Sequence, residues 1–422
     1  MINSKDKNIY NAMFFVMALL ASLVPRYIST FKIHLGINIS LYTIAVVLAF
    51  LLYSRKLRIY IKIECLFFII WFVYILLSVV RAEAFGLWAY YFVWSLTSVL
   101  FAQILYVSNN DYMYDSIVNG LLVGLCIHLI IGLYEITTHR YLFEVSIVDY
   151  KVYYGRVPIS IFHNPNDYAT FLVTVFPFLI LRMVQEKRRI RKTFLIGINV
   201  LCLYMIIRSE SRSAFYAMLI FCITLIWITR KKSLKNKLYL FSLIGLGIII
   251  VLCVPDIKEW IFSIFFINRI ETGSTDRARY NLIMNGLYFL KQTNGLGVGP
   301  GNLRLWLNER SIYYIGDLLY IHNWYVELLV TFGIPFFILY LLFHFGIVTK
   351  LIRRFDKKDS IWNMNNTMLL SFVSFSIVSI ASSSNIYSEW IWMYLVFIST
   401  YVLLTPNKKI INDSEHYYTL ER

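Results

Sequence analysis

Hydrophobic positions along this chain form long runs that are separated by short polar and charged stretches. Most of these runs are about 17 to 25 residues long, which is the length that crosses a bilayer as a helix. They lack the strict alternation of a membrane β-barrel. We therefore predict an all-α, polytopic membrane protein with about twelve spans. The expected spans are 9–24, 37–53, 62–80, 86–106, 116–136, 168–184, 194–208, 213–229, 238–254, 321–346, 365–385 and 388–404.

Charge supports this class. Charged residues make up 15% of the chain, against roughly 25% in ordinary globular domains. The net charge of +16 comes from basic runs in the short connections, as the positive-inside rule describes for cytoplasmic loops. This location argues against nucleic acid as a partner. Twelve spans place both termini on the cytoplasmic side together with the basic runs 54–62, 185–193, 230–237 and 350–358.

Three connections shape the expected topology. The loop 108–115 falls on the basic side although it is acidic, which is an exception to the rule. The segments 137–167 and 255–321 fall outside the cytoplasm, and loops of such length are usually functional or disordered. The larger one is too apolar for disorder, so we expect amphipathic helices near the membrane surface. We expect one integral domain over 1–422, with 255–321 as its extracytoplasmic loop.

Arginine on the outer side runs against the topological bias, so each outer arginine needs an explanation. Arg212 lies between two spans in the sequence Arg208-Ser-Glu-Ser-Arg212. Ionisable groups so close to hydrocarbon usually face an interior or a cavity and have a partner. Two readings stay open at this point: a structural pair with Glu210 or an interfacial position, and an anion-binding arginine.

Two further arginines, Arg277 and Arg279, open a helical pattern in the large loop. An arginine in the first turn opposes the helix dipole, so another partner is expected. A guanidinium fork matches phosphate oxygens well. Phosphate binding and a solvated loop charge are both open, as is the question of which arginine is the important one.

A glycine-rich stretch, Gly295 to Asn302, follows in the same loop. It lacks the spacing and the Lys-Ser/Thr ending of nucleotide loops. Glycine permits a positive φ and close backbone approach, which fits a sharp turn. A backbone nest for an anion is the alternative, with Gly299 and Asn302 as candidate binding residues.

His322 and Asn323 stand at the start of the span 321–346. Histidine exchanges a proton near neutral pH, so His322 is either an interfacial residue or a catalyst. His163 is the other histidine in a similar outer setting. Glu327 shares a helix face with Asn323. The chain offers neither a histidine at the i+4 position nor a dense carboxylate cluster here, so we expect no metal site.

Four motifs together resemble the O-antigen ligase and polysaccharide polymerase superfamily of integral membrane glycosyltransferases. The similarity covers about residues 162–343. The motifs are Asn164-Pro-Asn166, Ser211-Arg212-Ser-Ala, Arg279 followed by Gly297-Val-Gly-Pro-Gly-Asn302, and His322-Asn323-x-x-x-Glu327 followed by Gly333-Ile-Pro.

The resemblance implies an enzyme that takes a glycan from an undecaprenyl-pyrophosphate carrier, without metal or other cofactor. The reaction is expected at the outer face of the bacterial cytoplasmic membrane. Arg212 and Arg279 would hold the pyrophosphate, and His322 would activate the acceptor hydroxyl. The further substrate-binding candidates are Arg277, Asn323, Glu327, Gly299, Asn302 and Asn166.

Within this superfamily the acceptor distinguishes two functions. A polymerase joins repeat units into a surface polysaccharide, whereas a ligase passes the finished glycan to a lipid A core or another terminal acceptor. We favour the polymerase, because nothing in the sequence requires an outer-membrane lipid. A lipid-linked oligosaccharide flippase is a third reading, although the sequence shows no internal repeat. Candidate partners are the lipid bilayer, a chain-length regulator and a flippase.

Overall fold

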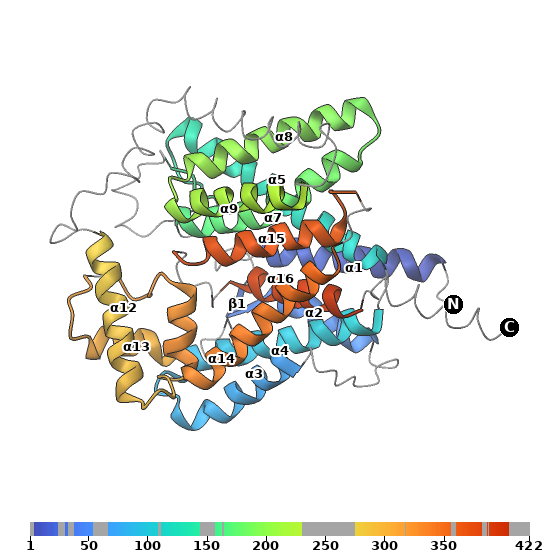
Figure 1. Ribbon diagram of the computed structural model, residues 1–422. Helices are drawn as coiled ribbons and strands as arrows, with labels where there is room; N and C mark the ends of the chain where they lie inside the picture. Colours follow the sequence, from blue (N-terminus) through green and yellow to red (C-terminus); the bar gives the residue numbers. More distant parts are fainter. Residues whose placement is uncertain are drawn as a thin grey trace.

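The protein is a bundle of helices with a small helical unit at one end (Figure 1). The computed structural model describes residues 4–23, 30–32, 38–53, 66–108, 111–143, 157–162, 164–229, 275–316, 318–355, 360–381, 386 and 388–404. The helices are α1 (Ser4–Leu23), α2 (Leu41–Tyr53), α3 (Leu66–Leu77), the 3₁₀ helix η2 (Ser78–Arg81), α4 (Phe85–Ser108), α5 (Asp111–Thr138), α7 (Pro165–Gln185), α8 (Arg189–Arg208), α9 (Arg212–Thr229), α12 (Thr275–Gln292), α13 (Asn302–Arg310), α14 (Trp324–Arg353), α15 (Met364–Val378) and α16 (Glu389–Leu404).

Six of the described helices are long and apolar enough to cross a membrane, by length and composition: α4, α5, α7, α8, α9 and α14. Shorter apolar helices are α1, α2, α3 with η2, α15 and α16. Every expected span except 238–254 coincides with one of these helices, and 238–254 lies outside the described residues. The chain is therefore a multi-pass helical membrane protein, while the count of twelve crossings stays a prediction.

Two short strands were not predicted. β1 (Thr30–Lys32) pairs antiparallel with β2 (Asn38–Ser40) between α1 and α2. The span expected from residue 37 consequently begins at Leu41. The Ser40 hydroxyl accepts a hydrogen bond from the Thr43 N–H at 3.0 Å, which is how serine starts a helix.

The acidic connection 108–115 is shorter than expected, because α5 already begins at Asp111. Asp115 forms an ion pair with Arg182 near the end of α7, with 2.7 Å between Oδ1 and Nη2. This ion pair gives a local reason for acidic residues in a connection at the basic end of the bundle. Part of the negative charge of this connection neutralises an arginine of the neighbouring helix.

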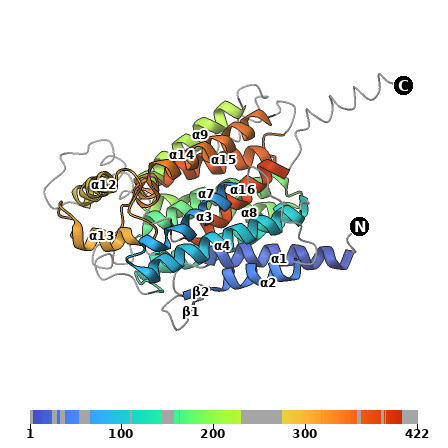
Figure 2. The same cartoon turned by 90° about the horizontal axis from the view of Figure 1, so that it is seen from below.

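The helices alternate in direction, since short connections such as 186–188 and 209–211 join them. We call the end that carries α12 and α13 the loop end; Figure 2 shows both helices there. α4, α7, α9, α14 and α16 begin at the loop end. The basic runs 187–192 and 350–354 lie at the opposite end, where α8 begins and α14 finishes.

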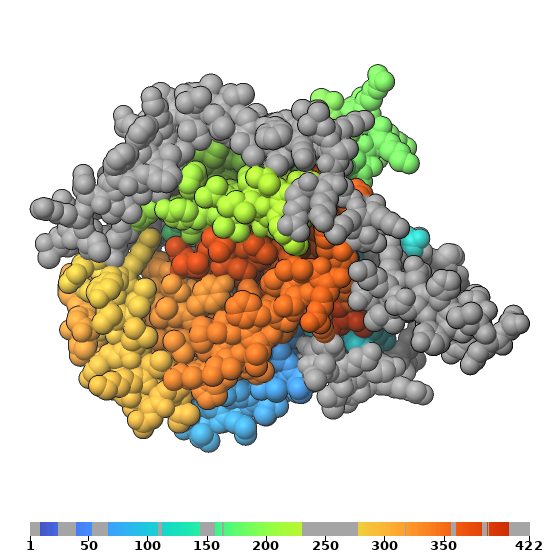
Figure 3. All heavy atoms as spheres, in the orientation of Figure 1, coloured from blue at the N-terminus to red at the C-terminus, as the bar shows by residue number. Residues whose placement is uncertain are grey.

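The bundle and the small unit have separate hydrophobic cores. The main core joins the long helices and includes Trp71 stacked on Trp392, with ring centroids 3.9 Å apart. A second core joins α12, α13, the connection between them and Val330 of α14. Its buried members are Leu282, Phe289, Val298, Leu303, Trp306, Leu307, Ile315, Ile321 and Val330. We call residues 275–321 the α12–α13 unit, and in Figure 3 it lies against α14.

Candidate functional site

The glycine-rich loop binds to a break in α14. Gly333 has φ 85° and ψ 173°, which is not helical, and Pro335 has no N–H to donate. The break frees backbone groups that a regular helix would pair internally. The glycine loop replaces those bonds: Val298 N–H donates to Val330 O at 2.9 Å, Gly299 N–H to Thr331 O at 3.0 Å, and Ile334 N–H to Gly295 O at 2.8 Å.

This arrangement favours the sharp turn over the anion nest. A nest presents successive backbone N–H groups to its ligand. Here the N–H groups of Val298 and Gly299 are both donated to α14. The loop therefore attaches the α12–α13 unit to the helix whose start carries His322.

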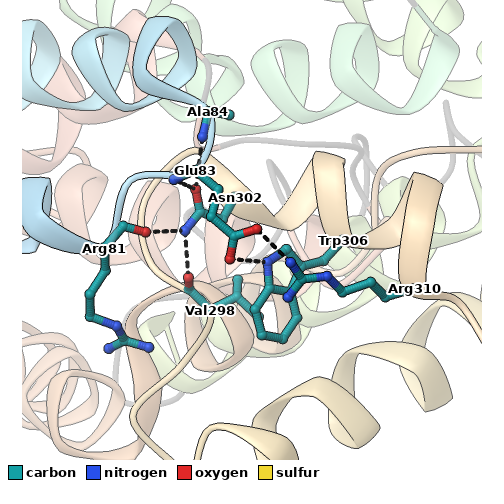
Figure 4. Close-up of polar contacts among 7 residues, drawn as sticks. All are labelled: Arg81, Glu83, Ala84, Val298, Asn302, Trp306 and Arg310. Carbon is teal, nitrogen blue, oxygen red and sulfur yellow. Dashed lines mark hydrogen bonds and ion pairs between the residues drawn. The ribbon is translucent and has the colours of Figure 1, made fainter.

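Asn302 uses its amide to fasten the same loop to the connection between α3 and α4 (Figure 4). Its side chain is buried at 1% exposure. Its four bonds are from Glu83 N–H to Oδ1 at 3.0 Å, from Ala84 N–H to Oδ1 at 3.3 Å, from Nδ2 to Arg81 O at 2.8 Å, and from Nδ2 to Val298 O at 2.9 Å. The amide has two donor hydrogens and two acceptor lone pairs, so the protein itself occupies all of them.

The connection Arg81–Ala84 makes further contacts with the α12–α13 unit. Arg81 Nη2 donates to Gly297 O at 2.9 Å. Glu83 accepts from Trp306 Nε1 at 3.0 Å and pairs with Arg310 Nη2 at 2.6 Å. Sequence reasoning missed these residues. The available signal was a pair of ionisable residues in a short connection between two apolar runs.

The two loop arginines lie in different environments. Arg277 is exposed, and its guanidinium lies 5.6 Å from the centre of the Tyr280 ring. Arg279 is half-buried, and its Nε is shielded from solvent. The structure thus separates two residues that the sequence could not rank, and Arg279 is the one turned towards the protein.

His322 lies at the start of α14 in a strained conformation. Its φ is 52°, a left-handed value that is uncommon outside glycine and clusters at functional sites. Its Nδ1 is buried and has no hydrogen-bond partner within the described residues. Burial and, second, the nearby guanidinium of Arg279 lower the pKa of His322 from 6.5 to about 3. His322 is therefore neutral, and Arg279 lies in its electrostatic neighbourhood.

Asn323 and Glu327 form the first turn of α14 after His322. The Asn323 side chain caps the helix by accepting from Val326 N–H at 3.1 Å. Glu327 is buried at 1% exposure in the first turn, where a carboxylate suits the helix dipole. The Asn323 cap therefore sets the start of α14 directly after His322.

Asn166 and Ser211 join the starts of α7 and α9. The Ser211 hydroxyl donates to Asn166 Oδ1 at 2.7 Å and lies 3.1 Å from the Ser213 hydroxyl. Arg212 stands between the two serines as the first residue of α9. Arg208, which the sequence reasoning did not choose as a site residue, is 8% exposed at the end of α8. His163, one residue before Asn164, lies outside the described residues.

Glu135 holds the segment that leads into α7. Its Oε2 accepts from Ile159 N–H at 2.9 Å and from Ser160 N–H at 2.8 Å. His128, on the same helix, lies 2.9 Å from the Ser160 hydroxyl through Nδ1. Both side chains are fully buried. Neither was singled out from the sequence, where they read as isolated polar residues inside an apolar run.

Two groups of candidate residues lie at the same level of the bundle. The Arg212 group is Asn166, Ser211 and Arg212, and the His322 group is His322, Asn323 and Glu327. α15 packs against α7, and the Ser371 hydroxyl donates to Thr174 O at 2.6 Å, which sets the level at which the two helices meet. Asn166 lies eight residues before Thr174, and Ser379 lies eight residues after Ser371. With the two helices antiparallel, Asn166 and Ser379 are therefore level with each other. Ser379 O in turn accepts from Trp324 N–H at 3.2 Å. The end of α15 therefore lies between the two groups.

Comparison with known proteins agrees with this architecture. The family model described as O-antigen ligase matches residues 197–341. The chain is also 28% identical over 350 residues to the teichuronic acid biosynthesis protein TuaE of Bacillus subtilis (strain 168), covering 80% of this chain and 71% of that protein. Both comparisons support a relationship to the O-antigen ligase superfamily. They indicate a membrane protein of polysaccharide biosynthesis, in agreement with the motifs.

The part of the chain that matches the O-antigen ligase family contains most of the candidate residues. It begins inside α8 and ends inside α14, so it includes Arg212, the α12–α13 unit and His322. Asn166 lies before the matched range and reaches the site through Ser211. The family implies a lipid-linked polysaccharide substrate in the membrane.

Proposed function

We propose that the protein polymerises undecaprenyl-pyrophosphate-linked repeat units into a surface polysaccharide. The observation that carries this proposal is that the half-buried Arg279 acts electrostatically on the neutral imidazole of His322, at the bundle end where Arg212 begins α9. A cation for a diphosphate and a neutral base for a hydroxyl are the two groups that glycan transfer from such a carrier needs.

In the proposed reaction the acceptor hydroxyl oxygen attacks the anomeric carbon of the donor sugar. The bond from that carbon to the phosphate oxygen breaks, and undecaprenyl pyrophosphate leaves with the bonding electron pair. His322 accepts the proton of the acceptor hydroxyl. Arg212 and Arg279 stabilise the charge that develops on the leaving diphosphate, an effect that is commonly the largest single contribution to catalysis.

The low pKa of His322 fits this order of events. Before the donor binds, burial and the Arg279 charge keep the imidazole unprotonated. A bound diphosphate would offset the Arg279 charge, and an opposite charge nearby favours the protonated imidazole. Donor binding would thus make His322 a stronger base when the acceptor proton has to be removed.

The setting we propose is the outer face of the bacterial cytoplasmic membrane, with both termini in the cytoplasm. The described basic runs 187–192 and 350–354 lie at the end opposite the loop end, and such runs usually mark the cytoplasmic side. The reaction needs no metal, and a flippase and a chain-length regulator would act with it. The acceptor is a second lipid-linked repeat unit, and the relative named for teichuronic acid biosynthesis favours polymer assembly.

A ligase is the second candidate, because the matched family model carries that description. Purified protein in detergent is given carrier-linked repeat units alone, and the products are separated by size. A ladder of glycans supports the polymerase, whereas transfer only after a terminal acceptor is added supports the ligase. His322→Ala should abolish either product. Movement of substrate across sealed vesicles without any new glycosidic bond would exclude both and indicate a transporter.

A further inference from the structure

The α12–α13 unit carries Arg279, and its core includes one residue of α14, Val330. Apolar packing against Val330 holds the unit to α14, and two sets of polar contacts fix its orientation. One set is the backbone pairing of the glycine loop with α14. The other is the side chain of Asn302 together with the Arg81–Ala84 connection (Figure 4).

We propose that Asn302 is a positioning residue, which sets the placement of Arg279 relative to His322 by fastening the α12–α13 unit to the connection between α3 and α4. This inference rests on the proposed function for its catalytic consequence. It replaces the expectation that Asn302 binds substrate, since all the hydrogen-bonding capacity of its amide is used by protein groups.

The contact of Asn302 carries more weight than the ion pair beside it. Glu83 and Arg310 are 38% and 42% exposed, and ion pairs between exposed side chains contribute little to stability. Asn302 is buried, and its removal would leave buried backbone groups without partners, which costs more than the loss of an exposed ion pair. The neighbouring Gly301 adds to the fit, because a Cβ there would lie 2.5 Å from Trp88 N.

Distance along α12 makes this placement sensitive. Arg279 precedes Gln292, the last residue of α12 before the glycine-rich loop, by 13 residues, or about 20 Å at 1.5 Å per residue. A tilt of about 3° at the loop would move Arg279 by about 1 Å. Displacements of that size cost about a hundredfold in rate when a catalytic group is misplaced.

A spectroscopic experiment tests the placement without any activity. In a variant lacking the five native cysteines, spin labels are attached at Tyr280→Cys in α12 and Tyr134→Cys in α5, both at exposed positions. Asn302→Ala should broaden or shift the measured distance distribution. Asn308→Ala, an exposed asparagine of the same helix, should leave it unchanged. An unchanged distribution in Asn302→Ala overturns the proposal, whatever reaction the protein performs.

Kinetics then test the link to Arg279. We expect Asn302→Ala to lower kcat at least tenfold while the KM for the donor changes less than threefold. In an Arg279→Ala background the same change should have no further effect, because the residue that it positions is gone. A raised donor KM with unchanged kcat would mean that Asn302 contacts the substrate. If Asn302→Ala does not fold, Arg81→Gln removes the bond to Gly297 O and should give the same pattern in weaker form.

Discussion

Gly297 and Gly333 touch through their backbones. A Cβ on Gly297 would lie 2.5 Å from Gly333 N, and a Cβ on Gly333 would lie 2.5 Å from Leu296 C. Both residues also have positive φ values, 75° and 85°, which disfavour side chains other than hydrogen. The large loop and the membrane helix α14 can therefore approach each other only because both positions are glycine.

Gly297→Ala should destabilise the protein by about 3 kcal/mol or more, since it combines left-handed strain with an overlap against backbone. We expect a lower thermal midpoint in detergent and loss of activity. Gly346→Ala is the matched control, because a Cβ there meets nothing within 4 Å. Its effect should be neutral or slightly stabilising, as alanine favours a helix. Equal thermal midpoints for the two variants would contradict the proposed close contact.

The sequence predicted the helical membrane class and the positions of the described spans, because apolar runs of spanning length have few other solutions. It could not show how the large loop meets the bundle. Glycine residues permit a sharp turn or a nest, and only the partners of their N–H groups decide between them. Asn302 was a candidate binding residue because the sequence does not show whether the partner of a polar side chain is substrate or backbone.

Arg279 and Arg277 are a second case that the sequence alone could not decide. They lie two residues apart on one helix and therefore on nearly opposite faces, but the sequence does not say which face meets the protein. The structure turns Arg279 inwards and leaves Arg277 exposed. Glu83 and Glu135 were missed because their partners are backbone and side-chain groups distant in sequence, which a local pattern does not reveal.

Arg279→Ala should reduce glycan transfer by about 10²- to 10³-fold, the usual effect of removing one group that stabilises a developing charge. Arg277→Ala, on the same helix, should retain activity within about threefold, because exposed charges contribute little. Both variants should fold like the wild type by size-exclusion chromatography. Initial rates with carrier-linked donor decide the matter. An equal loss in both would move the binding site to the exposed face of α12.

The imidazole of His322 should stay neutral well below its ordinary pKa. With a pKa of about 3, the folded protein binds fewer protons there than the unfolded chain between about pH 3 and pH 6.5, so lowering the pH through this window destabilises the fold. Modification of His322 by diethyl pyrocarbonate requires the neutral ring. Its rate, followed by mass spectrometry of the peptide, should hardly change from about pH 7 to about pH 5 relative to free imidazole.

Arg279→Gln tests the cause of that shift. Without the guanidinium, one of the two influences that lower the pKa of His322 is lost. The pKa should rise, and the modification rate should fall off at a higher pH than in the wild type. Arg277→Gln is the control and should follow the wild-type curve. Superimposable curves for Arg279→Gln and the wild type would mean that Arg279 does not act on His322.

Asn166 offers a test of the Arg212 side of the site that separates charge from geometry. Asn166→Asp keeps an oxygen that can accept the Ser211 hydroxyl, so the starts of α7 and α9 should stay joined. It also adds a negative charge beside Arg212, where we propose that the donor diphosphate binds. The donor KM should rise on the order of tenfold through repulsion. Asn166→Ala adds no charge and should raise the KM less, while lowering thermal stability through the lost hydrogen bond. The exposed Asn308→Asp should leave both quantities unchanged. If the aspartate and alanine variants raise the donor KM equally, the anion does not bind next to this residue, and Arg212 loses its proposed role.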